Sequence, residues 1–315
     1  MLKEIGGFLE LELEYKGQYH SNAIALNSCR NAIRYVIKAY KIKKLNVPYY
    51  TCPVVWQAIA KEHCEIIPYG IDKNFLPQKD FKPNDYVLYT NYFGILSSNV
   101  KLLAQEYNNL ITDNAMAFFM PNYGIASTYS PRKFFGVPDG GFLISNKLCS
   151  KKFPKDKSFN RFSHLLKRID KGANFAYKDF NKNDASLVNA PIKSMSPLTY
   201  KICGNIDYER AKQKRLENFH YLAESLSDLN KLNINITDED VPMYYPFLFE
   251  DDGLRQKFLQ NKIYIASCWR NLETICEKSS YEIYLQKYLF PLIIDQRYDK
   301  QDLNRIIKII RGTNE

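Results

Sequence analysis

Apolar positions in the first half of the chain alternate between the spacing of β-strands and that of α-helices. Helical spacing predicts a helix capped by Asn27 or Ser28, a second helix after Pro53 and a third over 100–107. Strands that alternate with helices are typical of a parallel or mixed sheet, so we expect an α/β fold. Short apolar runs of the kind that form strands occur at 23–26, 45–50, 65–69, 86–92, 110–112 and 142–145.

The pattern in the second half of the chain predicts a connecting arm followed by a small C-terminal domain. The segment 151–190 is rich in Lys, Asn and Asp and shows little periodicity, so we interpret it as an irregular interface arm or connecting segment. We therefore predict a large domain over 1–190 that includes the arm, and a small C-terminal α/β domain over 191–315. Within the latter, helices are expected at 200–226, 254–260 and 303–310, and strands at 243–248 and 263–266.

The composition is that of a globular protein. Hydrophobic residues make up 45% of the 315 positions and charged residues 25%, which excludes a mainly disordered chain. The net charge is +10, but the basic residues are spread and no zinc spacing accompanies them, so we do not expect nucleic-acid binding. A basic balance suits an enzyme that holds phosphates or nucleotides.

The spacing of the cysteines and histidines argues against a disulfide-stabilised protein and against a metalloprotein. The 7 cysteines form no CxxC pair and the 4 histidines lack metal-ligand spacing, so neither a disulfide framework nor a metal site is expected. No apolar run approaches the ~20 residues of a membrane span, and no signal peptide is evident. We expect a cytoplasmic protein that does not bind membranes. One histidine, His20, is a candidate for lining a substrate mouth.

Three segments carry candidate chemistry. The segment 27–32 (NSCRNA) follows a strand and starts a helix, whose free N–H groups and dipole favour a phosphate; an ordinary capped helix is the alternative. Asp113 ends a strand and would project into the crevice where α/β sheets bind ligands, unless it only caps a turn. Lys133 lies in a loop of hydroxyl and aromatic residues and could form a Schiff base with a carbonyl cofactor; a solvated lysine is the alternative.

The order of these segments resembles the DegT/DnrJ/StrS family of pyridoxal-phosphate-dependent sugar aminotransferases. That family has a Ser-(Gly/Cys)-Thr-Ala-Ala helix start, a strand ending in Asp-x-Ala-Gln, and a Ser-x-x-x-x-Lys loop that leads to Gly-(Asp/Glu)-Gly-Gly. Here the last motif is Pro-Asp-Gly-Gly at 138–141. The resemblance is clear over about 23–145 and weaker beyond. It implies a fold-type-I aminotransferase: a large domain with a mostly parallel sheet, a small C-terminal α/β domain, and a homodimer with shared active sites.

The resemblance also implies a role for each matching residue. Lys133 would attach pyridoxal 5'-phosphate and move a proton at the substrate carbon, while Asp113 would keep the pyridine nitrogen protonated. The other cofactor contacts that it implies are Ser28, Cys29, Arg30 and Thr128 at the phosphate, Cys52 or Tyr92 beside the ring, and Asn174 reaching the phosphate from a partner subunit.

Several positions depart from the family pattern. Met116 stands where the family has Gln, Arg30 replaces Thr, Cys52 is small for a stacking residue, and Ala176 replaces the Arg of a Gly-x-Asn-x-Arg motif. The expected function is amino transfer from an amino-acid donor to a keto-sugar nucleotide in surface polysaccharide biosynthesis. The alternatives are a cofactor-binding homologue without transaminase activity, and an enzyme using the same cofactor on a non-sugar substrate.

Overall fold

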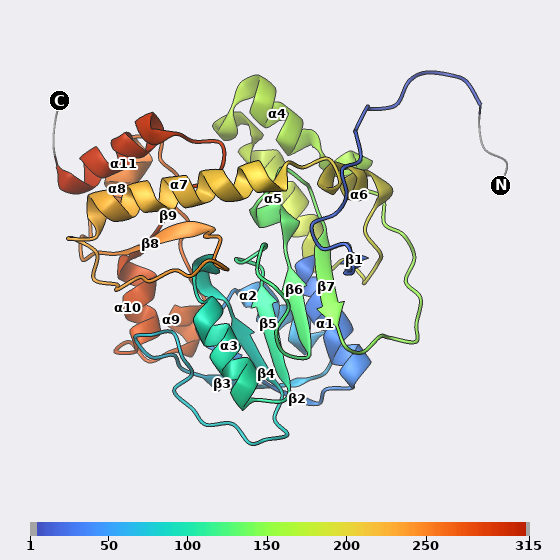
Figure 1. Cartoon of the computed structure of the whole chain (residues 1–315), viewed down its shortest axis with the longest axis horizontal. Coiled ribbons are helices and arrows are strands. Elements are labelled where there is room, and N and C mark those ends of the chain that lie inside the picture. The colour runs from blue at the N-terminus through green and yellow to red at the C-terminus, as the bar shows by residue number, and fades with distance from the viewer. Residues whose placement is uncertain (1–4, 313–315) are drawn as a thin grey trace.

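The computed structural model describes residues 5–312, and a seven-stranded sheet lies at the centre of the molecule (Figure 1). The strand order is β1-β7-β6-β5-β4-β2-β3. Neighbours from β6 to β3 pair in parallel, whereas β7 pairs antiparallel with both β1 and β6. This arrangement confirms the predicted α/β fold with a mostly parallel sheet. The strands are β1 (Ile24–Leu26), β2 (Lys44–Pro48), β3 (Glu65–Tyr69), β4 (Val87–Thr90), β5 (Leu110–Asn114), β6 (Ala126–Tyr129) and β7 (Gly141–Ser145).

Helices cover the sheet and make up much of the C-terminal part, in which β8 (Tyr244–Leu248) and β9 (Leu289–Ile293) form an antiparallel pair. Short 3-10 turns lie at η1 (Tyr92–Gly94), η2 (Pro131–Lys133) and η3 (Phe159–Arg161). The helices are α1 (Cys29–Tyr40), α2 (Pro53–Ala60), α3 (Ser97–Glu106), α4 (Ser163–Lys171), α5 (Ala173–Val188), α6 (Pro197–Cys203), α7 (Tyr208–Leu226), α8 (Leu254–Gln260), α9 (Leu272–Ile275), α10 (Tyr281–Tyr288) and α11 (Lys300–Arg311).

The core is built on both faces of the sheet. Successive residues of a strand face opposite sides, so each central strand contributes to two apolar clusters. Leu88 and Leu143 pack with residues of α1 and α2 on one face, whereas Tyr89 and Phe142 belong to the cluster on the other. That second cluster continues into the C-terminal part and includes Phe247 of β8. One continuous apolar core therefore holds the C-terminal part against the sheet.

Two helices occupy the segment that was expected to be irregular. α4 and α5 form a hairpin that turns at Gly172, where φ is 84°. Many of their apolar side chains are exposed, among them Ile169 at 83% and Phe175 at 60%. The expectation of irregular structure was wrong, because both helices form although the segment is rich in Lys, Asn and Asp and buries few of its side chains.

Other elements differ from the prediction in extent or number. The predicted helix over 200–226 is two helices, α6 and α7, separated at Gly204. The predicted strand over 86–92 ends at Thr90, because the chain turns at η1 with Phe93 at φ 59°. No strand forms at 263–266, where the chain pairs with no neighbouring strand. β6, α10 and β9 were not predicted; β6 is Ala-Ser-Thr-Tyr, which lacks the apolar run that marks the other strands.

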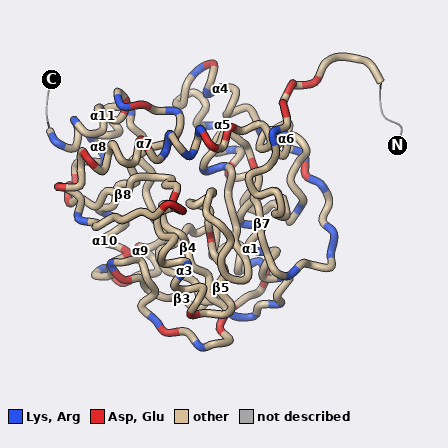
Figure 2. Tube along the Cα trace, viewed as in Figure 1, with Lys and Arg blue, Asp and Glu red and all other residues tan. Residues whose placement is uncertain are grey.

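Charged residues are distributed over the whole trace and do not gather on one side (Figure 2). This agrees with the spread of basic residues along the sequence. Over residues 5–312, no helix has both the length and the apolar character that crossing a bilayer requires.

Candidate active site

The start of α1 lies directly against the start of β7. Ser28 is the N-cap of α1, and its hydroxyl oxygen accepts a hydrogen bond from the Asn31 N–H at 3.3 Å. A Cβ at Gly141 would lie 2.4 Å from the carbonyl carbon of Ser28 and 2.5 Å from the Cys29 nitrogen. No side chain fits at this distance, so the second glycine of the Gly-Gly pair is what lets β7 approach the helix N-terminus.

Asp113 lies in β5 with its carboxylate buried. Its Oδ1 accepts hydrogen bonds from the Ala115 N–H at 3.0 Å and from the Thr128 hydroxyl at 3.4 Å, and the Cys29 thiol lies 3.9 Å from it. Burial raises the pKa of Asp113, while the positive charge of Lys133 and these hydrogen bonds act to lower it. Residues from α1, β5 and β6 thus converge on one carboxylate oxygen.

Lys133 ends η2 and is half-buried, and its positive charge acts on Asp113 and on three cysteine thiols. Burial raises the pKa of the Cys29 thiol to about 12 and also raises that of Cys52, while the charge of Lys133 acts to lower both. The same charge acts on the buried thiol of Cys268, which comes from the C-terminal part. The charge of Lys133 therefore acts on Asp113, Cys29 and Cys52, which lie in one neighbourhood, and their roles toward a cofactor stay predictions. No local sequence pattern identifies Cys268 as a site residue. Only the tertiary packing brings it under the influence of Lys133.

Arg30 lies beside this group with an unsatisfied guanidinium. Its side chain is only 11% exposed, and its Nη2 is 3.8 Å from Asp184 Oδ1 on α5. Arg132 shares that oxygen at 3.1 Å. Among the described residues, Nη1 of Arg30 is buried without a hydrogen-bond partner. Burial lowers the pKa of Arg30, and the charge of Arg132 lowers it further while Asp184 raises it. Two guanidinium groups on one carboxylate leave excess positive charge, which favours an anion here.

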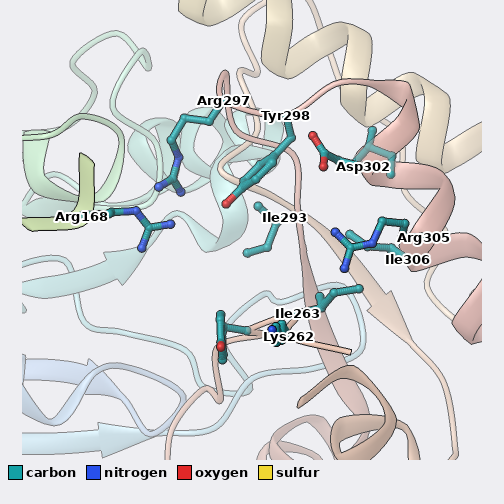
Figure 3. A pocket seen from close by; sticks show the side chains of 11 residues that line it. Arg168, Lys262, Ile263, Ile293, Arg297, Tyr298, Asp302, Arg305 and Ile306 are labelled. Carbon is teal, nitrogen blue, oxygen red and sulfur yellow. The ribbon is translucent and has the colours of Figure 1, made fainter. Parts of the chain in front are cut away.

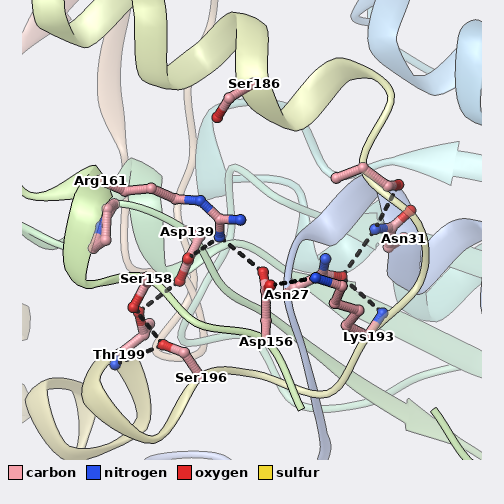
Figure 4. A network of polar contacts seen from close by, with 12 residues as sticks. Asn27, Asn31, Asp139, Asp156, Ser158, Arg161, Ser186, Lys193, Ser196 and Thr199 are labelled. Carbon is pink, nitrogen blue, oxygen red and sulfur yellow. Dashed lines mark hydrogen bonds and ion pairs between the residues drawn. The ribbon is translucent and has the colours of Figure 1, made fainter. Parts of the chain in front are cut away.

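A polar network anchors the loop that carries the glycine pair (Figure 4). The buried carboxylate of Asp139 accepts hydrogen bonds from Thr199 Oγ1 at 2.5 Å and from Arg161 Nη1 at 2.6 Å. Arg161 also pairs with Asp156 at 2.8 Å, and Lys193 pairs with Asp156 at 2.9 Å. Sequence reasoning noted Asp139 only as part of a motif. Its partners are far along the chain, so no local signal could have identified this anchoring role.

Two further predicted ligands, Tyr92 and Asn174, have other contacts within the chain. Tyr92 is fully buried in the aromatic core, with its ring centroid 5.5 Å from that of Tyr50 and 5.3 Å from that of Phe75. Asn174 is exposed on α5, where its side-chain oxygen accepts a hydrogen bond from the Tyr264 hydroxyl at 2.6 Å. The prediction for Asn174 concerns the site of a second subunit, so it stays a prediction.

His20 is a core residue and does not line a substrate mouth. It is 7% exposed, its Nε2 lies 2.7 Å from the Phe118 carbonyl oxygen, and its ring centroid is 3.9 Å from that of Tyr129. Burial lowers the pKa of His20 to about 4. Across residues 5–312, no cluster of three or more His, Cys, Asp or Glu side chains is arranged to hold a metal ion.

Comparisons with known proteins identify the fold. No family model matches the sequence, and no curated protein matches it. Solved structures do match. A DegT DnrJ EryC1 StrS aminotransferase from Brucella abortus has a TM-score of 0.62 at 13% identity, over 92% of this chain and 85% of that one. The sugar aminotransferase CalS13 from Micromonospora echinospora has a TM-score of 0.64 at 8% identity, over 93% and 88%. NtdA from Bacillus subtilis, with bound cofactor PMP, has a TM-score of 0.66 at 12% identity, over 92% and 72%. The chain thus has the fold of the DegT/DnrJ/EryC1/StrS sugar aminotransferases, a fold-type-I architecture.

Proposed function

We propose that this protein is a pyridoxal-phosphate-dependent aminotransferase that moves an amino group from an amino-acid donor to a keto-sugar nucleotide. The observation that carries the proposal is the meeting of a half-buried lysine, Lys133, with a buried strand-end carboxylate, Asp113, beside the N-terminus of α1. Fold alone does not determine activity, so the argument depends on this group of residues.

The residues present fit the phosphate of the proposed cofactor. The N–H groups of Cys29 and Arg30 lie in the first turn of α1, where helix geometry leaves them without intrahelical partners. Gly141 keeps the approach to them clear of side-chain atoms. The buried Nη1 of Arg30, which has no partner among the described residues, adds a charged donor. We propose that these groups hold the phosphate.

Thr128 has a second possible partner. The sequence assigns it to the phosphate, but its hydroxyl donates to Asp113 Oδ1. We propose that it orients the carboxylate in this chain. All three contacts described for Asp113 end on Oδ1, so none of them occupies Oδ2, which we propose faces the ring nitrogen.

The cofactor, when bound, would supply an electron sink and carry the amino group between donor and acceptor. Asp113 would hold a proton on the ring nitrogen through its negative charge. Lys133 would bind the cofactor carbonyl and, once released from it, take up and return a proton at the substrate carbon. Cys52, the N-cap residue of α2, presents a small side chain beside Lys133 and would leave room at the ring face.

Assembly as a homodimer is part of the proposal. The α4–α5 hairpin exposes Ile169, Phe175 and Tyr177, at 83%, 60% and 62%. Large exposed apolar side chains on one element are typical of an interaction surface, and Asn174 lies on the same hairpin. Light scattering should show a dimer; a monomer with full cofactor occupancy would contradict this part of the proposal.

The division into a large domain, 1–190, and a small one, 191–315, is likewise proposed. The seven free cysteines support a reducing cytoplasm.

The function is tested in two stages. The protein is loaded with pyridoxal phosphate, reduced with borohydride and mapped by peptide mass spectrometry. We expect the adduct on Lys133 and its loss in Lys133→Ala, with Lys151→Ala as the control. An adduct on another lysine would contradict the assignment.

In the second stage, glutamate and other amino donors are added and the visible spectrum is followed. A spectral change that a keto-sugar nucleotide then reverses is the expected result. If donors cause no change, the protein binds the cofactor without transamination. If only non-sugar ketones reverse the change, the enzyme acts on a different substrate class.

A further inference from the structure

A small basic pocket lies between α4, α11 and the segment that follows β9, with a volume of about 230 Å³ (Figure 3). Four cationic side chains line it and only one acidic side chain does. The cations are Arg168, Lys262, Arg297 and Arg305, and the acid is Asp302.

Two of the cations are held in place by neighbouring groups. Arg297 forms a two-point ion pair with Asp295, at 2.8 Å from Nε and 2.7 Å from Nη2, and its guanidinium lies 5.2 Å from the centroid of the Tyr298 ring. Arg305 Nη2 donates to the Asn261 carbonyl at 3.1 Å. Fixed guanidinium groups lose little conformational entropy when they bind a ligand.

The other two cations have no counter-ion. Among residues 5–312, neither Arg168 nor Lys262 has a side-chain hydrogen bond or ion pair within the chain. The guanidinium groups of Arg168 and Arg297 point toward one another in Figure 3, and the Tyr298 hydroxyl points into the space beside them. Asp295 neutralises Arg297 and Asp302 can offset one more cation, so the pocket retains unbalanced positive charge. Such a site attracts anions, and facing guanidinium groups suit phosphate oxygens in particular.

The pocket is joined to the loop that carries the candidate catalytic lysine. Gln296, between Asp295 and Arg297, donates from Nε2 to the carbonyl of Phe134 at 2.8 Å. Phe134 directly follows Lys133 in the chain. The segment that carries Arg297 is therefore tied by a hydrogen bond to the residue that follows Lys133.

We propose that this pocket binds a diphosphate, and that in the proposed function, on which this second assignment rests, it seats the diphosphate of the nucleotide-linked substrate. Its volume is below the roughly 300–1,000 Å³ typical of sites that enclose a whole drug-sized ligand. It therefore suits the charged middle of an extended substrate, whose sugar would reach toward Lys133 while the nucleoside lies outside. Arg168, Arg297 and Lys262 would contact the phosphate oxygens.

Calorimetric titration of the full chain without cofactor tests the pocket. The probes are inorganic pyrophosphate and UDP, at one fixed ionic strength. The double variant Arg168→Gln/Lys262→Gln removes the two unpaired cations without stranding a counter-ion, and thermal melting checks its folding. Lys151→Gln/Lys152→Gln is the control, because it removes the same charge from two exposed lysines. We expect Kd to rise at least tenfold in the pocket variant and less than twofold in the control, with a shallower salt dependence in the pocket variant.

The other results of the titration distinguish the pocket from alternative anion sites. Equal losses in both double variants, or no loss in either, would overturn the proposal. Loss in Arg30→Gln with full retention in the pocket variant would place the anion at the start of α1 and would also overturn it. Tighter binding of UDP than of pyrophosphate would show that a nucleotide is the source of the diphosphate, whereas equal binding would favour a free diphosphate. Binding is measured without turnover, so failure of the aminotransferase proposal would leave this result readable.

Discussion

Asp113 and Thr128 are register partners on the neighbouring parallel strands β5 and β6, and the Thr128 hydroxyl donates to Asp113 Oδ1 at 3.4 Å. The family resemblance implies contacts with different parts of the cofactor for these residues, from motifs that are separate along the chain. The sheet places them side by side. Their contact means that the orientation and pKa of one candidate catalytic group depend directly on the other residue.

Asp113→Asn should reduce turnover much more than cofactor binding. The change keeps the shape of the side chain but removes its charge, and a hydrogen bond to a charged group contributes roughly 1.5–3 kcal/mol. That corresponds to about 10–100-fold in cofactor affinity. Turnover should fall further, because negative charge develops on the substrate carbon only in the transition state. Cofactor titration and single-turnover rates measure the two effects. Near-normal turnover would mean that Asp113 is only a structural strand-end residue.

Thr128→Val should move the acidic limb of the activity profile to higher pH. The Thr128 hydrogen bond lowers the pKa of Asp113, which burial has already raised. Without it the carboxylate protonates at a higher pH, so activity that needs the ionised form is lost sooner as pH falls. The pH dependence of kcat/KM measures this. Thr112→Val, one position before Asp113 in β5, is the control; an unchanged limb in Thr128→Val would contradict the prediction.

Gly141→Ala should destabilise the fold and weaken cofactor binding. The added Cβ would meet the backbone of Ser28 and Cys29 at 2.4–2.6 Å, and backbone atoms cannot move aside as a flexible side chain can. Overpacking of this kind costs typically about 1–3 kcal/mol. Gly136→Ala is the matched control, because its Cβ would meet nothing within 4 Å and its φ is not positive. Urea unfolding compares the two; equal stabilities would show that the close approach does not restrict residue 141.

Arg30→Gln and Asp184→Asn should change phosphate affinity in opposite directions. The first removes the buried guanidinium whose Nη1 has no partner among the described residues, and the second removes the carboxylate that Arg30 and Arg132 share. Charge-assisted hydrogen bonds of about 1.5–3 kcal/mol predict a loss of roughly tenfold or more for Arg30→Gln. Asp184→Asn should bind pyridoxal phosphate more tightly. Fluorescence titration measures both, and changes of the same sign would contradict the proposed role of Arg30 as a charged donor to the phosphate.

His20 should make the protein less stable as pH falls from 7 to 4. Burial lowers the pKa of folded His20 from 6.5 to about 4, so between these values the unfolded chain binds the proton and the folded chain does not. At about 1.4 kcal/mol per pKa unit, moving from pH 7 to pH 5 should cost about 2 kcal/mol of unfolding free energy. His20→Gln should flatten this dependence, and His220→Gln, at an exposed position, should retain it. Equal slopes in all three proteins would rule out His20 as the cause.

Part of the candidate site could be predicted because its features are local. Ser28 caps α1, and Asp113 lies at the end of a buried strand, as the apolar runs around them indicate. The strand over 65–69 and the helix over 254–260 have the predicted bounds. In each case the deciding interaction is between residues that are close along the chain, so spacing and capping rules apply.

Other features of the site have no local signal. Tyr92 packs against Tyr50 and Phe75, contacts that no local pattern indicates, and its place beside the cofactor ring stays a prediction. The helices α4 and α5 were not recognised, because their segment is rich in Lys, Asn and Asp and few of its side chains pack against the core.

The sequence by itself determined the α/β alternation, a helix start at Asn27 or Ser28, and the order of Asp113, Lys133 and the glycine pair. Those properties follow from hydrophobic period, capping chemistry and the conformational freedom of glycine, all of which act over a few residues. Only the tertiary structure decided that Thr128 bonds Asp113, that Asp184 reaches Arg30, and that four basic residues from three separate segments share one pocket. Such contacts join segments far apart in the chain. Their geometry is set by how the helices and the C-terminal part pack on the sheet, which no short window of sequence specifies.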